Sequence, residues 1–102
     1  MRVMAKISKR IEEEIADTAE YAEMALLEKD QRPWLAEILY TISLEERSHM
    51  NRLHQAVVRL IEEYRKEHGE PPADMLSRYE YEHKRHIEAA RDARVYQDMY
   101  ND

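Results

Sequence analysis

Apolar residues recur along this chain at the three- and four-residue spacing of an α-helix, and only two short segments interrupt the pattern. The interruptions are 29–33, which ends in Arg-Pro, and 68–72, which contains Gly-Glu-Pro-Pro. Proline disfavours helix at the residue before it, and glycine is common just past a helix end. The sequence therefore predicts an all-α fold of three long helices, at about 3–29, 33–67 and 73–100. The short first connection makes the first two helices an antiparallel hairpin.

Each predicted helix carries an apolar stripe on one face when its residues are placed at intervals of about 100°. In the first helix the stripe consists of Met4, Ile7, Ile11, Ile15, Thr18, Ala22, Ala25 and Leu26. In the second it consists of Leu35, Ile38, Leu39, Ile42, Leu53, Ala56, Val57, Leu60 and Tyr64. In the third it consists of Leu76, Tyr79, Ile87 and Ala90, and it weakens beyond Ala90. Stripes of this width are typical of a helical bundle.

Ionisable residues interrupt or flank these stripes. The second helix lacks an apolar residue at the centre of its stripe for two turns between Ile42 and Leu53, and a glutamate and a histidine stand there instead. A similar pair interrupts the third stripe, and one glutamate lies at the edge of the first. The five residues are Glu14, Glu46, His49, Glu80 and His83. Glu13 and Glu20, by contrast, are predicted to point to solvent.

Two Glu-x-x-His motifs stand out among these residues, one formed by Glu46 and His49 and the other by Glu80 and His83. Residues three apart on a helix project side by side, so the carboxylate and the imidazole can bind one ion. Helical bundles build dinuclear iron or manganese sites from glutamates and such motifs. Burying a carboxylate is costly unless it is paired or bound to metal. We therefore expect all five residues, Glu14 included, to bind metal.

The level of each residue along the bundle separates the five into two groups. If the first connection turns near Gln31, position 14 lies opposite about 48, level with Glu46 and His49. The same rule at the second connection places His83 opposite about 57, which is about 12 Å from His49. One antiparallel three-helix bundle does not bring all five together. Three arrangements would bring all five residues together. The second helix could end earlier, the third helix could cross the others at a steep angle, or a second copy of the chain could complete the site.

Composition and charge narrow the class of protein. The chain has 102 residues, no cysteine and a net charge of −6, and its basic residues are interleaved with acidic ones. This pattern argues against a nucleic-acid partner, a disulfide framework and a thiolate zinc site. No apolar run is long enough for a membrane span, and the first ten residues lack the apolar segment of a secretory signal. We expect one domain, 1–102, in the cytoplasm, stabilised as a homo-oligomer because so short a chain buries little apolar area.

Plainer interpretations of the same residues stay open. Glu46 could pair with an arginine, and the polar positions could form a layer in a homodimeric interaction module that binds no metal. A metal-binding protein without turnover is a third interpretation. His54 lies off the main stripe and is predicted to pack on a side face, whereas His86, at the edge of the third stripe, is a reserve ligand.

These residues resemble the ferritin-like superfamily, and more closely its short rubrerythrin-type members from bacteria and phages. The resemblance is carried by 14–22, 43–54 and 79–83, and it is strongest for Glu14 with the Glu46-x-x-His49 motif. It implies a dinuclear iron or manganese site that oxidises Fe(II) or reduces peroxide. The superfamily normally has four helices and further carboxylates, which this chain lacks. Encapsulated ferritins supply the missing ligands by pairing two chains. Because cysteine is absent here, the chain has no rubredoxin-type iron site, and the sequence does not identify the electron donor.

Overall fold

The computed structural model describes residues 2–102, and three helices account for nearly all of them. The helices are α1 (Arg2–Glu28), α2 (Pro33–His68) and α3 (Ala73–Asn101). Each begins and ends within one residue of its predicted bound, and no strand occurs in the described range. The all-α prediction and the number of helices are therefore confirmed.

The two connections are short and are closed by backbone hydrogen bonds. Arg32 donates its backbone N–H to the carbonyl oxygen of Glu28 at 2.9 Å, and Pro33 then begins α2. At the other end of α2, the N–H of Gly69 donates to the carbonyl of Arg65 at 3.0 Å. Gly69 adopts a φ of 80°, which side chains with a Cβ rarely tolerate, so glycine at this position ends the helix.

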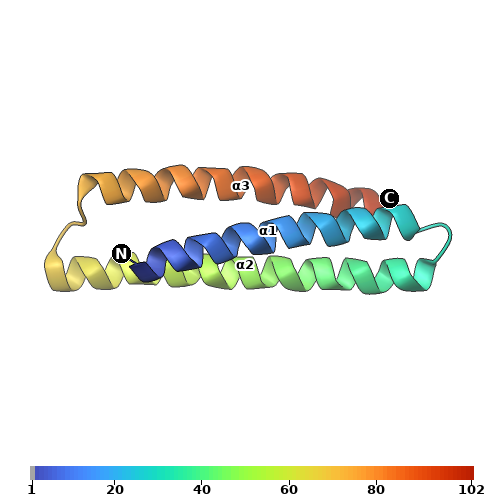
Figure 1. The fold of residues 1–102 in the computed structure, drawn as a ribbon, viewed down its shortest axis with the longest axis horizontal. Coiled ribbons are helices and arrows are strands. Elements are labelled where there is room, and N and C mark those ends of the chain that lie inside the picture. Colours follow the sequence, from blue (N-terminus) through green and yellow to red (C-terminus); the bar gives the residue numbers. More distant parts are fainter. Residues whose placement is uncertain (1) are drawn as a thin grey trace.

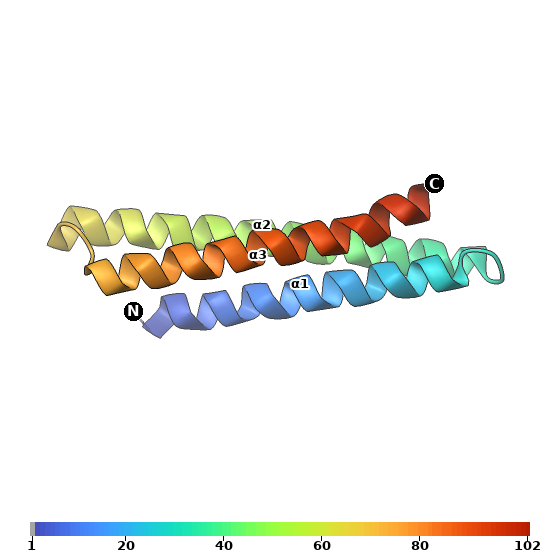
Figure 2. The same cartoon turned by 90° about the horizontal axis from the view of Figure 1, so that it is seen from above.

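The helices form an elongated bundle of 56 × 18 × 18 Å (Figure 1). Figures 1 and 2 together show the three helices running alongside one another for most of their length, with the N-terminus at the same end as the connection between α2 and α3. α1 packs closely along both other helices, whereas α2 and α3 keep a wider separation. Side chains bridge that separation: the rings of Tyr40 and Tyr100 stack at 4.4 Å, as do those of His54 and His83.

The main apolar core lies towards the first half of α1, where α1 meets the second half of α2. Its buried members are Met4, Ile11, Ile15, Val57 and Ile61. Towards the other end of the bundle small residues take over, because Ala22, Ala25 and Ala36 are completely buried. Small side chains let the two backbones approach closely there. The predicted stripe of α1 is confirmed, since each of its members is buried or half-buried.

Two predicted core positions are wrong. Ile38 is 52% exposed because α2 faces α1 through Ala36 and Leu39, which lie to either side of it. Ile87 is 40% exposed because α3 is rotated so that His86 faces inward instead.

The apolar stripe of α3 weakens beyond Ala90, as predicted, but the helix stays packed there. Ala93 and Gln97 are both 2% exposed, so the inward face continues to the end of the helix with small and polar side chains. None of the three helices in residues 2–102 contains an apolar stretch long enough to cross a membrane.

Candidate metal centre

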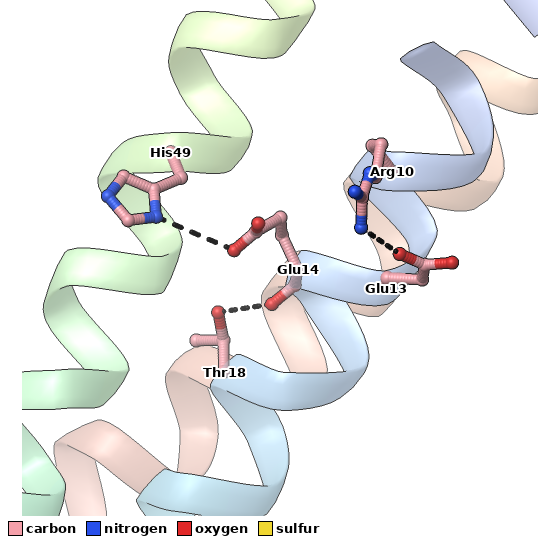
Figure 3. Close-up of polar contacts among 5 residues, drawn as sticks. All are labelled: Arg10, Glu13, Glu14, Thr18 and His49. Atoms are coloured by element: carbon pink, nitrogen blue, oxygen red, sulfur yellow. Dashed lines mark hydrogen bonds and ion pairs between the residues drawn. The ribbon is translucent and has the colours of Figure 1, made fainter. Parts of the chain in front are cut away.

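Two carboxylates and an imidazole converge where α1 passes α2. Glu14 on α1 and Glu46 and His49 on α2 each offer one ligand atom, and these atoms all lie within 4.8 Å of one another. Figure 3 shows Glu14 and His49 pointing toward each other from the two helices. The sequence predicted that these three residues share a face and a level, and the structure brings them together.

Local helix geometry sets the direction of each side chain. Ile11 and Ile15 are buried against α2, and this orientation holds Glu14, between them on the helix, at the edge of the same face. Thr18 Oγ1 donates a hydrogen bond of 2.6 Å to the backbone carbonyl of Glu14 (Figure 3). On α2 the three-residue spacing places Glu46 and His49 side by side. Two rigid helices therefore position the donors.

Crowding of the carboxyl groups perturbs the acidity of the site. A proton shared with Glu14 as a side-chain hydrogen bond raises the pKa of Glu46, and burial and the negative charge of Glu14 act in the same direction. The positive charge of protonated His49 opposes this shift. When both carboxyl groups are ionised neither can donate, and Glu14 Oε2 is then buried without a hydrogen-bond partner. Its nearest basic atom is His49 Nδ1 at 3.7 Å, which is too long for a hydrogen bond.

No lysine or arginine in residues 2–102 forms an ion pair with Glu14 or Glu46. Arg10 is close in sequence, but it pairs with Glu13 at 3.0 Å (Figure 3). The interpretation in which Glu46 pairs with an arginine therefore finds no support in this part of the chain. A cation would satisfy both the negative charge and the buried oxygen.

The site opens to the surface through a hollow on the α1–α2 face. The hollow is lined by Glu14 and His49 together with Arg10, Arg52 and Leu53. The side chain of Glu14 is 22% exposed and that of His49 is 52% exposed, so the imidazole stands at the rim. The sequence interpretation passed over Arg10 and Arg52. Their spacing, four residues before Glu14 and three after His49, is the helical signal that would have found them.

Glu80 and His83 lie outside this group. Glu80 is exposed, and His83 stacks on His54 at 4.4 Å and on Tyr79 at 5.7 Å. The register of α2 and α3 explains the separation, because it places His83 opposite His54, more than one turn beyond His49. α2 runs unbroken to His68, and α3 lies alongside the other helices without a steep crossing (Figures 1 and 2).

Two of the three arrangements that would unite all five predicted ligands are therefore absent from residues 2–102. The participation of Glu80 and His83 in metal binding stays a prediction. His54 packs on a side face as predicted, whereas His86, expected at the edge of a stripe, is buried.

The donor set fits a divalent transition metal. Carboxylate and imidazole are ligands for iron, manganese and zinc, and three protein donors leave positions on the ion for further ligands. Comparison of the chain with protein-family models, with curated proteins and with solved structures found no match.

Proposed function

We propose that this protein is a ferritin-like metal-binding protein in which Glu14, Glu46 and His49 hold iron or manganese. The observation that carries the proposal is the convergence of three donor atoms from two helices within 4.8 Å. The buried, partnerless Glu14 Oε2 supports it, because an oxygen in that position loses its hydration and gains nothing in return unless an ion or a proton is bound. A metal would remove that cost.

A second copy of the chain completes the site in this proposal. One chain supplies two glutamates and a histidine, and two copies together supply the carboxylate-rich set from which bundles form dinuclear sites. The hollow over His49 leaves the donors accessible from the α1–α2 face, where a second α1–α2 hairpin would make a four-helix arrangement. The proposed assembly is therefore a homodimer or a larger even-numbered oligomer.

The reaction class proposed for the assembled site is oxidation of Fe(II) or reduction of peroxide. A pair of iron or manganese ions supplies the redox equivalents for such chemistry when it is bound. The residues of the chain bind the ions and balance their charge with carboxylates. Glu46 binds an ion only as a carboxylate, and because its pKa is raised, protons compete with the metal at higher pH than at an ordinary glutamate.

Metal content tests the proposal. Protein purified without chelator should carry about one iron or manganese per chain, the ratio expected when two copies share a dinuclear site. Glu46→Gln preserves the shape of the side chain but removes the anionic ligand, so bound metal should fall. Glu45→Gln is the matched control, because Glu45 is the adjacent residue of α2 and is exposed. Equal metal loss in both variants, or none in either, would contradict the assignment.

Turnover is tested separately. Oxygen consumption on addition of Fe(II) should be faster with wild-type protein than with Glu46→Gln, and the rate with Glu45→Gln should match wild type. Bound metal without any acceleration would reduce the proposal to a binding protein without catalysis.

The second candidate is an all-α homodimeric interaction module with a polar layer and no metal. The observation that favours it is the raised pKa of Glu46, because a proton shared with Glu14 could neutralise the pair in place of an ion. Under this function Glu46→Gln would leave the dimer intact, and the protein would bind no iron or manganese at any pH. Light scattering on metal-free and metal-loaded protein, with metal analysis, separates the two candidates.

A further inference from the structure

A second recess lies between α2 and α3, where the two helices are held apart by their side chains. It is a cleft of about 260 Å³ that shares no lining residue with the hollow over the candidate metal centre. Its polar lining residues are Arg47, Asn51, His54, His83, His86 and Arg91. Its apolar lining residues are Ile11, Met50, Ile87 and Ala90. We call this recess the histidine cleft.

The charge of the histidine cleft is opposite to that of the protein. Aspartate and glutamate make up 22 of the 102 residues, yet none of them lines the cleft. Arg47 donates one hydrogen bond, of 3.3 Å, to Gln97 Oε1. Within residues 2–102 neither Arg47 nor Arg91 forms an ion pair with a carboxylate. Two guanidinium groups of the described chain thus line one recess without a carboxylate at ion-pair distance from either of them.

Two imidazole nitrogens in the cleft walls are buried without a hydrogen-bond partner. They are His83 Nδ1 and His86 Nε2, and the side chain of His86 is only 10% exposed. The nearest carboxylate oxygen to His86 Nε2 is Glu12 Oε1 at 4.0 Å, beyond hydrogen-bond distance, and that oxygen lies 3.2 Å from Arg85 Nη1 instead. Buried polar groups in native proteins are normally satisfied, so unpartnered nitrogens beside a cleft point to a ligand.

The geometry argues against a metal ion as that ligand. His54 and His83 stack with their ring planes only 12° apart, so they present faces to each other and their nitrogens do not converge on one point. The only group of three donors in residues 2–102 that could hold an ion is the one at Glu14. The two arginines would also repel a cation.

We propose that the histidine cleft binds a small organic anion. Its carboxylate or phosphate group is held by the two arginines and the imidazoles, because guanidinium groups donate paired hydrogen bonds to such oxygens. Its apolar body packs on Met50 and Ile87. A few polar donors around an apolar floor is the usual composition of a small-ligand site.

Proton uptake should accompany binding, and His54 contributes to it. Burial lowers the pKa of His54, and the positive charges of His83 and His86 on α3 lower it further. An anion beside the imidazole favours the protonated form and so opposes these effects.

His86 responds in the same sense. Burial lowers its pKa most, the charges of Arg85 and His83 add to this, and Glu12 on α1 and Glu82 on α3 oppose it. Arg47 on α2 and Arg91 on α3 carry fixed positive charge into the same recess. Both histidines therefore bind a proton more readily with the anion present, and affinity should rise as the pH falls.

The test uses metal-free, full-length protein and three anionic probes. Phenyl phosphate and benzoate distinguish a phosphate from a carboxylate head, and inorganic phosphate reports the head alone. At least one organic probe should shift the imidazole C2-proton NMR signals of His54, His83 and His86 while leaving His68 unchanged. Its affinity should exceed that of inorganic phosphate, and it should rise by up to about tenfold per pH unit between pH 8 and pH 6.

A matched pair of arginine variants locates the site. Arg91→Gln should lower the affinity for the organic anion by about tenfold, which is the loss expected for one charge-assisted contact. Arg94→Gln is the control, because Arg94 lies nearly one turn further along α3, is exposed and is 3.9 Å from Asp98 outside the cleft. Both arginines are exposed, so circular dichroism should show that each variant folds as the wild type does.

Four results would overturn the assignment. The first two are equal affinity of wild type and Arg91→Gln for the organic anion, and binding of benzylamine as tight as that of benzoate. Binding of inorganic phosphate as tight as that of phenyl phosphate would remove the organic part of the ligand, and histidine signals that respond to Zn²⁺ but to no anion would make the cleft a metal site.

Discussion

The candidate metal centre and the histidine cleft are two polar interruptions in one small bundle, and they differ in both charge and helix spacing. At the metal centre two carboxyl groups are crowded together between α1 and α2, which pack closely. At the histidine cleft two arginines and three imidazoles line a gap between α2 and α3, which are farther apart. Close packing brings donor atoms near enough to hold one ion, whereas wider spacing leaves room for a molecule. In both proposals the spacing of the helices therefore decides which kind of ligand the polar cluster accepts.

The largest effect is expected from Ile11, which links the two regions. Ile11 is 2% exposed, belongs to the main core, lies one turn before Glu14 and lines the histidine cleft. Ile11→Ala should lower the free energy of unfolding by about 2–5 kcal/mol, because it removes buried apolar volume and leaves a cavity. Urea unfolding measures this change. Ile38→Ala is the control, and at 52% exposure it should cost about 0.5 kcal/mol or less.

A pair of histidine substitutions should separate the two regions. His49→Ala removes a proposed direct ligand, so it should lower iron or manganese affinity by at least the roughly 10- to 100-fold that loss of an outer partner costs, and leave phenyl phosphate binding unchanged. His54→Ala should do the reverse, because His54 lines the cleft and offers no donor to the metal centre. Competition titrations for the metal and calorimetry for the anion measure the two affinities. If either variant lowered the affinities for the metal and for the anion equally, the two regions would be one site.

Metal binding should weaken as the pH falls, because Glu46 must lose its proton to bind an ion. Its pKa is raised, so competition from protons begins at a higher pH than for an ordinary glutamate, whose reference value is 4.5. Metal affinity measured from pH 7 downward should therefore decline before that value is reached. Glu46→Gln should bind weakly and show a flatter pH profile.

The smallest effect concerns the metal-free protein. His54 and His86 have lowered pKa values in the folded chain. Below pH 6.5 the unfolded chain therefore binds protons that the folded chain does not, and the free energy of unfolding decreases as the pH decreases. Glu46 acts in the opposite sense, because its raised pKa lets the folded chain bind a proton first. Thermal unfolding measured from pH 7 down to pH 4 should show a steeper loss for Glu46→Gln than for wild type. A parallel loss in both proteins would contradict the opposing role of Glu46.

The parts of the structure that could be predicted from the sequence are those fixed by a regular period and a short loop. The stripe of α1 has an unbroken helical period, so its buried face was predicted correctly. The first connection is short enough to fix the register of α1 against α2, and that register places Glu14 beside His49. Local geometry was therefore enough to predict which three of the candidate side chains come together.

The orientation of α3 could not be predicted in the same way. Its inward face carries His86, Ala93 and Gln97, while the larger apolar residue Ile87 is turned outward. Gln97 can be buried because it donates to Ser43 Oγ at 3.2 Å and accepts from Arg47, both on α2. A rule that assigns apolar residues to the core misses a helix that docks through hydrogen bonds across a gap. The histidine cleft was missed for the same reason, since it exists only because α2 and α3 stand apart.

The wide separation of α2 and α3 also has a consequence for local opening of the native bundle. α3 packs closely only on α1, and at its C-terminal end it meets α2 through Tyr100 stacked on Tyr40 and a hydrogen bond from Asn101 Nδ2 to the Tyr40 hydroxyl at 2.8 Å. Segments with few buried apolar contacts exchange their amide hydrogens through low-energy openings. The amides of α3 should therefore exchange with deuterium sooner than those of the α1–α2 hairpin. A ligand that contacts both α2 and α3 in the cleft would slow amide exchange in α3 most, because it would have to dissociate before α3 could separate from the hairpin.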